Sequence, residues 1–250
     1  MRIGQLCQNG SYHDRYQGVC TVPDNILTQT VKDYPDPEVI KDYPDFEVVA
    51  PQDIEKRSFE IIRSELIKEF PPELEPIIVR VIHATADFDY AENLCFSEGV
   101  VDIIQKAILS GIHIITDTNM AMSGINKKKL AQHGGTISCF MADSDVAEEA
   151  RRRGVTRAMV SMEKVTDLGG HPLIVIGNAP TALIRVCELY KEGVLSPSAV
   201  IGVPVGFVNV EASKELLTFS GLPYIVARGR KGGSTVAAAI VNALLYGIES

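Results

Sequence analysis

Short apolar runs bounded by turn residues alternate with helical patterns along the chain from about residue 111. Five such runs are flanked by Gly, Pro, Ser or Asp and lie at 111–117, 135–141, 172–178, 198–205 and 223–229. Segments such as 143–154 and 180–193 have helical spacing between the runs. Apolar strands that alternate with helices are typical of a parallel sheet covered on both faces. The pattern predicts an α/β fold: a mostly parallel sheet of about five strands with helices on both faces, in a Rossmann-like, three-layer arrangement.

A further helix is predicted at 51–70. Pro71 and Pro72 stop it, and its apolar residues recur at helical spacing: Ile54, Ile61, Ile62, Leu66 and Phe70.

The stretch VRVIHATADFDY, residues 79–90, fits either a strand or a helix. Pro and Glu residues at 72–76 are typical of a helical first turn, so we favour a helix. Val79, His83 and Asp87 then share one face, and His83 lies in the last turn, where the helix dipole favours the imidazolium form. A histidine at the edge of an apolar run is commonly a structural residue, so this segment alone leaves the role of His83 open.

The first fifty residues differ from the rest of the chain. They hold eight Asp and Glu residues against four Lys and Arg residues, and a tandem repeat, KDYPDPEVI at 32–40 and KDYPDFEVV at 41–49. Two copies are too few for a solenoid, and the Tyr-Pro-Asp steps favour turns. We expect residues 1–50 to be an acidic appendage and residues 51–250 to be a single α/β domain.

Composition and charge narrow the function. The 250 residues are 46% hydrophobic and 22% charged, which is typical of a globular protein. The longest apolar stretch, 236–248, is shorter than the roughly 20 residues that span a bilayer, and the N-terminus has no apolar signal region, so we expect a cytoplasmic protein without a membrane partner. Five scattered cysteines without C-x-x-C spacing argue against a disulfide framework and a zinc site. The net charge of −8 argues against nucleic-acid binding, so an anionic ligand needs local cations.

Glycine-bearing loops follow the predicted strands, where ligands of parallel α/β folds bind. They lie at 116–124, 177–183, 202–208 and 228–235. None contains G-x-G-x-x-G, and Lys231 precedes Gly232 rather than Ser or Thr, which disfavours both a dinucleotide site and a P-loop. Plain turn and capping roles also fit, with Asn178 as an N-cap and Pro180 near a helix start. Four such loops at one sheet edge nevertheless predict a crevice whose N–H groups and cations suit carboxylates or phosphates.

Several of these segments together resemble one family. The chain is similar to the precorrin-8X methylmutases, also called cobalt-precorrin-8 methylmutases, of corrin biosynthesis from about Ile54 to Leu245. The resemblance is carried by RSF (57–59), RVIHATAD (80–87), TDTNM (116–120), IGNAPTAL (176–183), GVPVGFV (202–208) and RGRKGGST (228–235). The appendage has no counterpart in the family pattern, and Glu211-Ala212-Ser213-Lys214 departs from the Glu-Ser-Lys expected there.

The resemblance implies an isomerase that moves a methyl group from C-11 to C-12 of precorrin-8, or of its cobalt complex, to give hydrogenobyrinic or cobyrinic acid. It also implies a homodimer and a catalytic histidine, which is His83 here. No cofactor is implied, since any cobalt comes with the corrinoid substrate, which carries several carboxylates. The resemblance implies substrate contacts at Ser58 and Arg157. The other expected substrate-binding residues are Thr85, Asn178, Thr181, Gly206, Lys231, Gly233 and Ser234. We expect Ser58, Arg157 and three of the loops to line one pocket with His83.

A methyl shift on a conjugated tetrapyrrole is consistent with a catalytic histidine, because protonation of a ring nitrogen helps the methyl group to migrate. Histidine is the side chain suited to act as a general acid near neutral pH. His113, His133 and His171 have no ligand spacing with a carboxylate, so no protein-held metal is expected. The basic runs at 127–129 and 151–153 are predicted to be solvated helix faces. The alternative is a non-catalytic tetrapyrrole carrier or sensor, in which His83 is an axial ligand or a packing residue.

Overall fold

The computed structural model describes residue 47 and residues 49–248, and the chain divides into two units, residues 1–49 and 50–250. The tandem repeat at 32–49 lies almost entirely outside the described residues. None of the helices that the structure describes is long and apolar enough to cross a membrane.

A six-stranded sheet forms the centre of the second unit. Its order is β1-β6-β5-β4-β2-β3. The strands are β1 (Leu94–Phe96), β2 (His113–Thr116), β3 (Thr136–Ser138), β4 (Leu173–Ile176), β5 (Ala199–Gly202) and β6 (Tyr224–Ala227). The last five are parallel and confirm the five predicted runs, whereas β1 pairs antiparallel with β6 and was not predicted. A three-residue strand is too short to show the alternation on which such a prediction depends.

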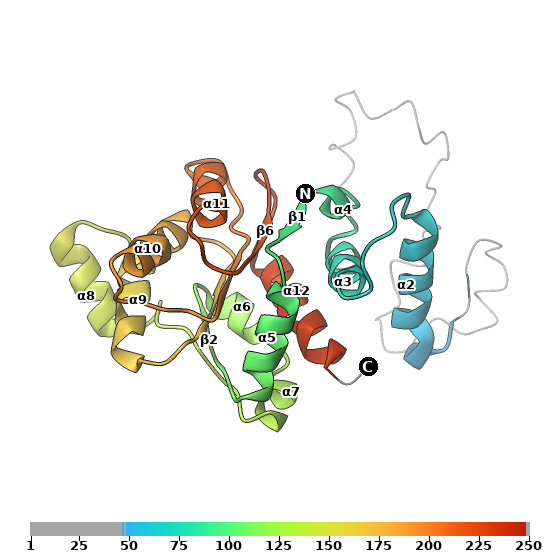
Figure 1. The fold of residues 1–250 in the computed structure, drawn as a ribbon, viewed down its shortest axis with the longest axis horizontal. Helices are drawn as coiled ribbons and strands as arrows, with labels where there is room; N and C mark the ends of the chain where they lie inside the picture. The colour runs from blue at the N-terminus through green and yellow to red at the C-terminus, as the bar shows by residue number, and fades with distance from the viewer. Residues whose placement is uncertain (1–46, 48, 249–250) are drawn as a thin grey trace, which may run out of the picture. The chain divides into compact units, whose positions relative to one another are not determined.

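Alternate residues of each strand face opposite helical layers, which confirms the three-layer prediction. In β4, Leu173 and Val175 belong to one apolar core, and Ile174 and Ile176 belong to the other. The first core is covered by α3 (Glu75–Thr85), α5 (Val100–Leu109), α6 (Asn119–Gly124), α7 (Lys127–Gln132) and α12 (Ser234–Gly247). The second is covered by α9 (Arg157–Lys164), α10 (Pro180–Lys191) and α11 (Val210–Thr218), with α8 (Ser144–Arg153) packed outside α9 (Figure 1).

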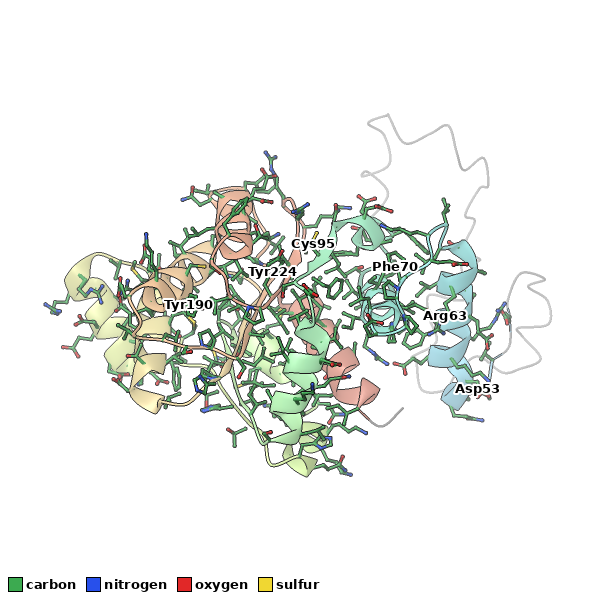
Figure 2. All side chains as sticks on the ribbon, in the orientation of Figure 1. Asp53, Arg63, Phe70, Cys95, Tyr190 and Tyr224 are labelled. Carbon is green, nitrogen blue, oxygen red and sulfur yellow. The ribbon has the colours of Figure 1, made fainter. Side chains whose placement is uncertain are left out.

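The predicted helix at 51–70 is shorter than expected. A 3-10 turn, η2 (Pro51–Asp53), leads into α2 (Ile54–Glu65), and Leu66 is already extended. Leu66 and Phe70 still pack against the core, but from the connection between α2 and α3. Figure 2 labels Phe70. Their apolar spacing therefore reflects burial of an irregular segment rather than one helical face.

The helix favoured for the His83 segment is confirmed as α3, and His83 lies in its last turn. The helix ends at Thr85 because Ala86 is left-handed, with φ 52° and ψ 32°, and its N–H bonds to the Ile82 carbonyl. Asp87 is consequently off the helix. The prediction that it continues the face of Val79 and His83 is wrong, because the chain reverses at Ala86.

The basic runs lie on helices as predicted. Residues 127–129 open α7, and residues 151–153 form the exposed last turn of α8. Two of the remaining histidines have ordinary structural partners, since His113 contacts the Ser138 hydroxyl at 2.9 Å and His171 contacts the Ser196 carbonyl at 2.8 Å.

Candidate functional site

The strand order reverses between β2 and β4, and a buried carboxylate lies at this switch point. Asp117, directly after β2, is fully buried and accepts N–H bonds from Gly177, Asn178 and Ala179 at 2.7–2.8 Å. Burial raises the pKa of the Asp117 carboxyl, and the three N–H bonds oppose that rise. The start of α10 is therefore capped by the protein's own carboxylate, at the place where related folds bind a ligand phosphate.

This arrangement corrects the capping role considered for Asn178. The N-cap of α10 is Ala179, Pro180 occupies the first turn as expected, and the cap is provided by Asp117 from another strand. Asp117 was assigned no role from the sequence pattern, although an Asp directly after a buried strand is a usable signal. The Asn178 side chain itself is exposed.

The loop after β2 also contacts the start of α12. The Thr118 hydroxyl lies 2.7 Å from that of Ser234, and it also accepts from the Ala121 N–H at 3.1 Å. Gly177 packs so closely on α12 that an added Cβ would lie 2.8 Å from the Ser234 Cα. The ends of β2 and β4 and the start of α12 are thus fixed against one another.

His83 stands where two small pockets adjoin. It is exposed, and its ring meets the Phe59 ring edge to face, with centroids 5.2 Å apart. One pocket, of about 260 Å³, contains Ser58 and Phe88, and the other, of about 280 Å³, contains Met120, Ser234 and Asn242. The structure thus brings Ser58 and Ser234 together with His83. The Ser58 hydroxyl donates to the Ile54 carbonyl at 2.8 Å, and that of Thr85 donates to the Val81 carbonyl at 2.8 Å.

Lys231 contacts the segment that follows α3, and its ammonium is already paired there. It contacts the carboxylates of Asp87 and Asp89, both at 2.6 Å. The hydrogen bond from Lys231 is the main cause that lowers the pKa of Asp87, and the two carboxylates raise the pKa of Lys231. Lys231, predicted to bind substrate, therefore joins the loop after β6 to the end of α3.

The rest of the loop at 228–233 is also held by internal hydrogen bonds. The Gly233 N–H donates to the Val203 carbonyl at 2.9 Å, and the Gly206 N–H donates to the Arg230 carbonyl at 3.2 Å. Only glycine fits at 232, because an added Cβ would lie 2.2 Å from the Val203 oxygen. The N–H groups of Gly206 and Gly233, predicted to face substrate, are thus used within the protein.

Arg157 lies away from the His83 pockets. It is exposed in the first turn of α9 and lines a separate pocket with residues of α8, in the helical layer opposite α12. Thr181 lies near it, since its hydroxyl is 2.8 Å from that of Thr156. Within one chain, the single pocket predicted for Arg157 and His83 is therefore divided.

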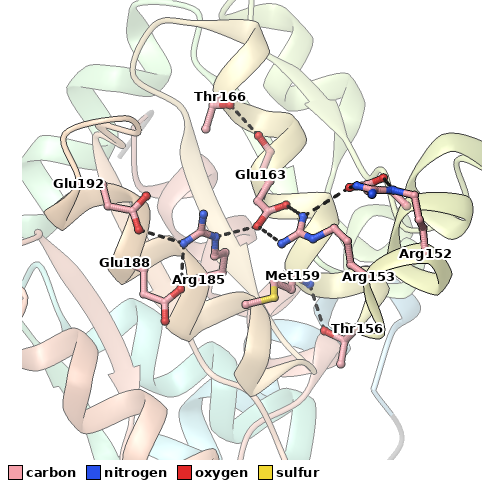
Figure 3. Close-up of polar contacts among 10 residues, drawn as sticks. Arg152, Arg153, Thr156, Met159, Glu163, Thr166, Arg185, Glu188 and Glu192 are labelled. Atoms are coloured by element: carbon pink, nitrogen blue, oxygen red, sulfur yellow. Dashed lines mark hydrogen bonds and ion pairs between the residues drawn. The ribbon is translucent and has the colours of Figure 1, made fainter.

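An ion-pair network fixes the helix that bears Arg157. Glu163 of α9 accepts from Arg153 of α8 and, at 2.9 Å, from Arg185 of α10, which also contacts Glu188 and Glu192 (Figure 3). The hydrogen bond from Arg153 is the main cause that lowers the pKa of Glu163. The network joins three helices on this side of the sheet.

Among residues 47 and 49–248, no group of three or more His, Cys, Asp or Glu residues is arranged to hold a metal ion.

Comparison with known proteins agrees with the motifs. A family model described as "Precorrin-8X methylmutase" matches residues 53–247. The chain is 45% identical over 197 residues to the cobalt-precorrin-8 methylmutase of Priestia megaterium, covering 78% of this chain and 88% of the relative. It is 47% identical over 204 residues to that of Salmonella typhimurium, covering 78% and 95%. A solved structure of the precorrin-8x methyl mutase from Thermus thermophilus is similar with a TM-score of 0.73 and 36% identity, over 79% of this chain and 98% of that one.

Proposed function

The chain belongs to the precorrin-8X methylmutase family and is an isomerase of corrin biosynthesis, and we propose that His83 is the general acid of its methyl migration. The substrate is precorrin-8 or cobalt-precorrin-8, and the methyl group moves from C-11 to C-12. The product is hydrogenobyrinic or cobyrinic acid.

The chemistry requires a proton and a fixed macrocycle. Protonation of a ring nitrogen beside the migration site withdraws electrons from the π system and lowers the barrier to methyl migration. The methyl group stays on the substrate, so neither a methyl donor nor a redox cofactor takes part. A positioned general acid accelerates such a step by roughly 10²–10⁴-fold.

The position of His83 carries the proposal. Its ring is exposed at the junction of two pockets, and Phe59 packs against the ring and limits its orientation. His83 lies in the last turn of α3, at the C-terminal end of the helix. Ser58 and Ser234 line the pockets on either side of the ring.

We also propose that the enzyme is a homodimer whose second chain completes the pocket. The two pockets beside His83 measure about 280 and 260 Å³ and are open, whereas ligand sites typically measure roughly 300–1,000 Å³. A corrinoid with several carboxylates needs more enclosure and more cations than these walls provide. Light scattering should report twice the mass of one chain, and a monomer that turns over substrate would contradict this.

Visible absorption spectroscopy tests whether the protein turns over its substrate or only binds it. The protein is mixed with precorrin-8 and, separately, with cobalt-precorrin-8, and the chromophore is followed over time. We expect a continuous spectral change that consumes excess substrate with one of the two. A static shift that saturates at one substrate per chain would instead indicate a carrier or sensor.

A further inference from the structure

A buried lysine of α11 lies beneath the cationic loop that follows β6. Lys214 has no exposed surface, and its ammonium donates to the carbonyls of Gly229 at 2.7 Å and Lys231 at 2.8 Å (Figure 1 locates α11 and β6). Lysine is rarely fully buried, because removing an ammonium from water costs free energy unless hydrogen bonds replace its hydration. The loop carbonyls provide such bonds here.

Two glutamates of α11 contact the same loop from the surface. Glu211 lies 3.2 Å from Arg230, and Glu215 lies 3.7 Å from Arg228. These two isolated, exposed ion pairs contribute little, whereas hydrogen bonds from a buried ammonium are charge-assisted and shielded from solvent. Lys214 is therefore the main contact by which α11 fixes the loop.

The loop passes this constraint on to the end of α3. Lys231 accepts from Lys214 through its backbone carbonyl, and its side chain contacts Asp87 and Asp89. These two carboxylates follow α3, whose last turn bears His83. Both contacts belong to one residue, because Lys214 binds the Lys231 carbonyl and Asp87 and Asp89 bind the Lys231 ammonium. A shift of the loop backbone therefore displaces the Lys231 side chain and, with it, the end of α3.

We propose that Lys214 is a positioning residue for the isomerase reaction: its buried ammonium holds the loop at 228–233 so that Lys231 fixes the end of α3 and His83 beside the substrate. The proposal rests on the function proposed above. The buried ammonium of Lys214 takes no part in the proton transfer itself.

We expect a rise in pH to affect the stability of the fold and the binding of substrate in opposite directions. Burial lowers the pKa of Lys214 to about 8, and the charge of Glu211 opposes this shift. Between that value and the ordinary lysine pKa, the unfolded chain holds a proton that the folded chain lacks, so this group makes the fold more stable as pH rises. Over the same range the loop loses its ammonium. Substrate binding should therefore weaken while stability increases.

Other charged and titratable groups lie on the elements around Lys214. The charged and titratable groups on its own helix and on the loop are Glu211, Glu215, Arg228, Arg230 and Lys231. Those on the packed elements α10 and β6 are Arg185, Cys187, Glu188, Tyr190, Lys191 and Tyr224. Burial raises the pKa of Cys187 to about 11, so that thiol stays neutral through this pH range.

The test compares Lys214→Met with Lys191→Met, an exposed lysine at the end of α10. Replacing a buried charge with an apolar side chain of similar length is often neutral or stabilising, so the Lys214 variant should unfold no earlier than wild type. Its kcat/KM at pH 7 should nevertheless fall by roughly 10–100-fold, as expected for loss of charge-assisted hydrogen bonds. Amide hydrogen exchange at 228–233 should become faster, and Lys191→Met should change none of these values.

Binding of the corrin product supplies the pH readout without involving proton transfer to substrate. In wild type, product affinity should fall between pH 7 and about 9 while the thermal midpoint rises relative to Lys214→Met. The variant should show a flat affinity. If the variant does not fold, the fall in wild-type product affinity over this pH range is the test by itself.

Wild-type kcat/KM in Lys214→Met, or an unchanged pH dependence of product binding, would overturn the positioning role. Faster exchange without loss of turnover would overturn it too. Failure of the proposed function looks different, because the wild-type protein would then turn over neither form of precorrin-8.

Discussion

Replacing His83 with alanine should separate catalysis from stability. The side chain is exposed, and its ring packs edge to face against Phe59. Such a ring pair contributes about 0.5–1.5 kcal/mol. Because the ring is exposed, we expect the unfolding free energy to fall by only about 1 kcal/mol.

The rate should change much more. Loss of a general acid reduces the rate by roughly 10²–10⁴-fold, which corresponds to about 3–5 kcal/mol of barrier. Product affinity should stay within about tenfold of wild type, because the proton acts mainly in the transition state. Single-turnover absorption gives the rate, titration with product gives the affinity, and urea unfolding gives the stability.

His171→Ala is the matched control, since His171 is also exposed and contacts the Ser196 carbonyl away from both pockets. It should lose neither rate nor affinity. A near wild-type rate in His83→Ala, with a normal fold, would refute the general-acid role. His83 would then be a packing residue for Phe59.

Three further predictions concern the appendage, the Lys231 contact and the buried carboxylate. Deleting residues 1–50 should leave turnover intact, because the family match begins just after them, and an inactive or insoluble truncation would contradict this. Lys231→Met should raise the pKa of Asp87 in an NMR titration, because the hydrogen bond from Lys231 is the main cause that lowers this pKa. In wild type, the pairing should stabilise the fold at pH values above the ordinary carboxyl pKa. This stabilisation should be lost as the pH falls through the lowered pKa of Asp87. An unchanged Asp87 titration would mean that the contact does not form in solution. Asp117→Ala should reduce the unfolding free energy in urea by roughly 2–4 kcal/mol, because three N–H groups lose their acceptor, whereas exposed Asp102→Ala should change little.

Much of the fold could be predicted from local pattern. The five parallel strands, α3, α8 and α10 all follow from apolar spacing and turn residues. The misses have physical causes. β1 is too short to show a period, α2 stops before Phe70 because the later apolar residues pack from irregular backbone, and Ala86 turns the chain away before Asp87.

The candidate site could be predicted less completely. The motifs identified Ser58, His83 and Ser234, which do line adjoining pockets. They gave no role to Asp117 or Lys214, whose partners are backbone groups of other segments. Backbone partners leave no trace in residue identity, so a sequence pattern does not reveal them.

By itself the sequence determined the alternation of strands and helices, the loops at the carboxyl ends of the strands and the family, because these depend on residue types at short spacing. The tertiary structure decided which charges are engaged. Lys231 meets Asp87 across 144 residues of chain, and Asp117 meets Gly177 across 60. Such pairings arise only when the sheet brings distant loops together, and they decide whether a cation or an N–H group serves the substrate or the fold.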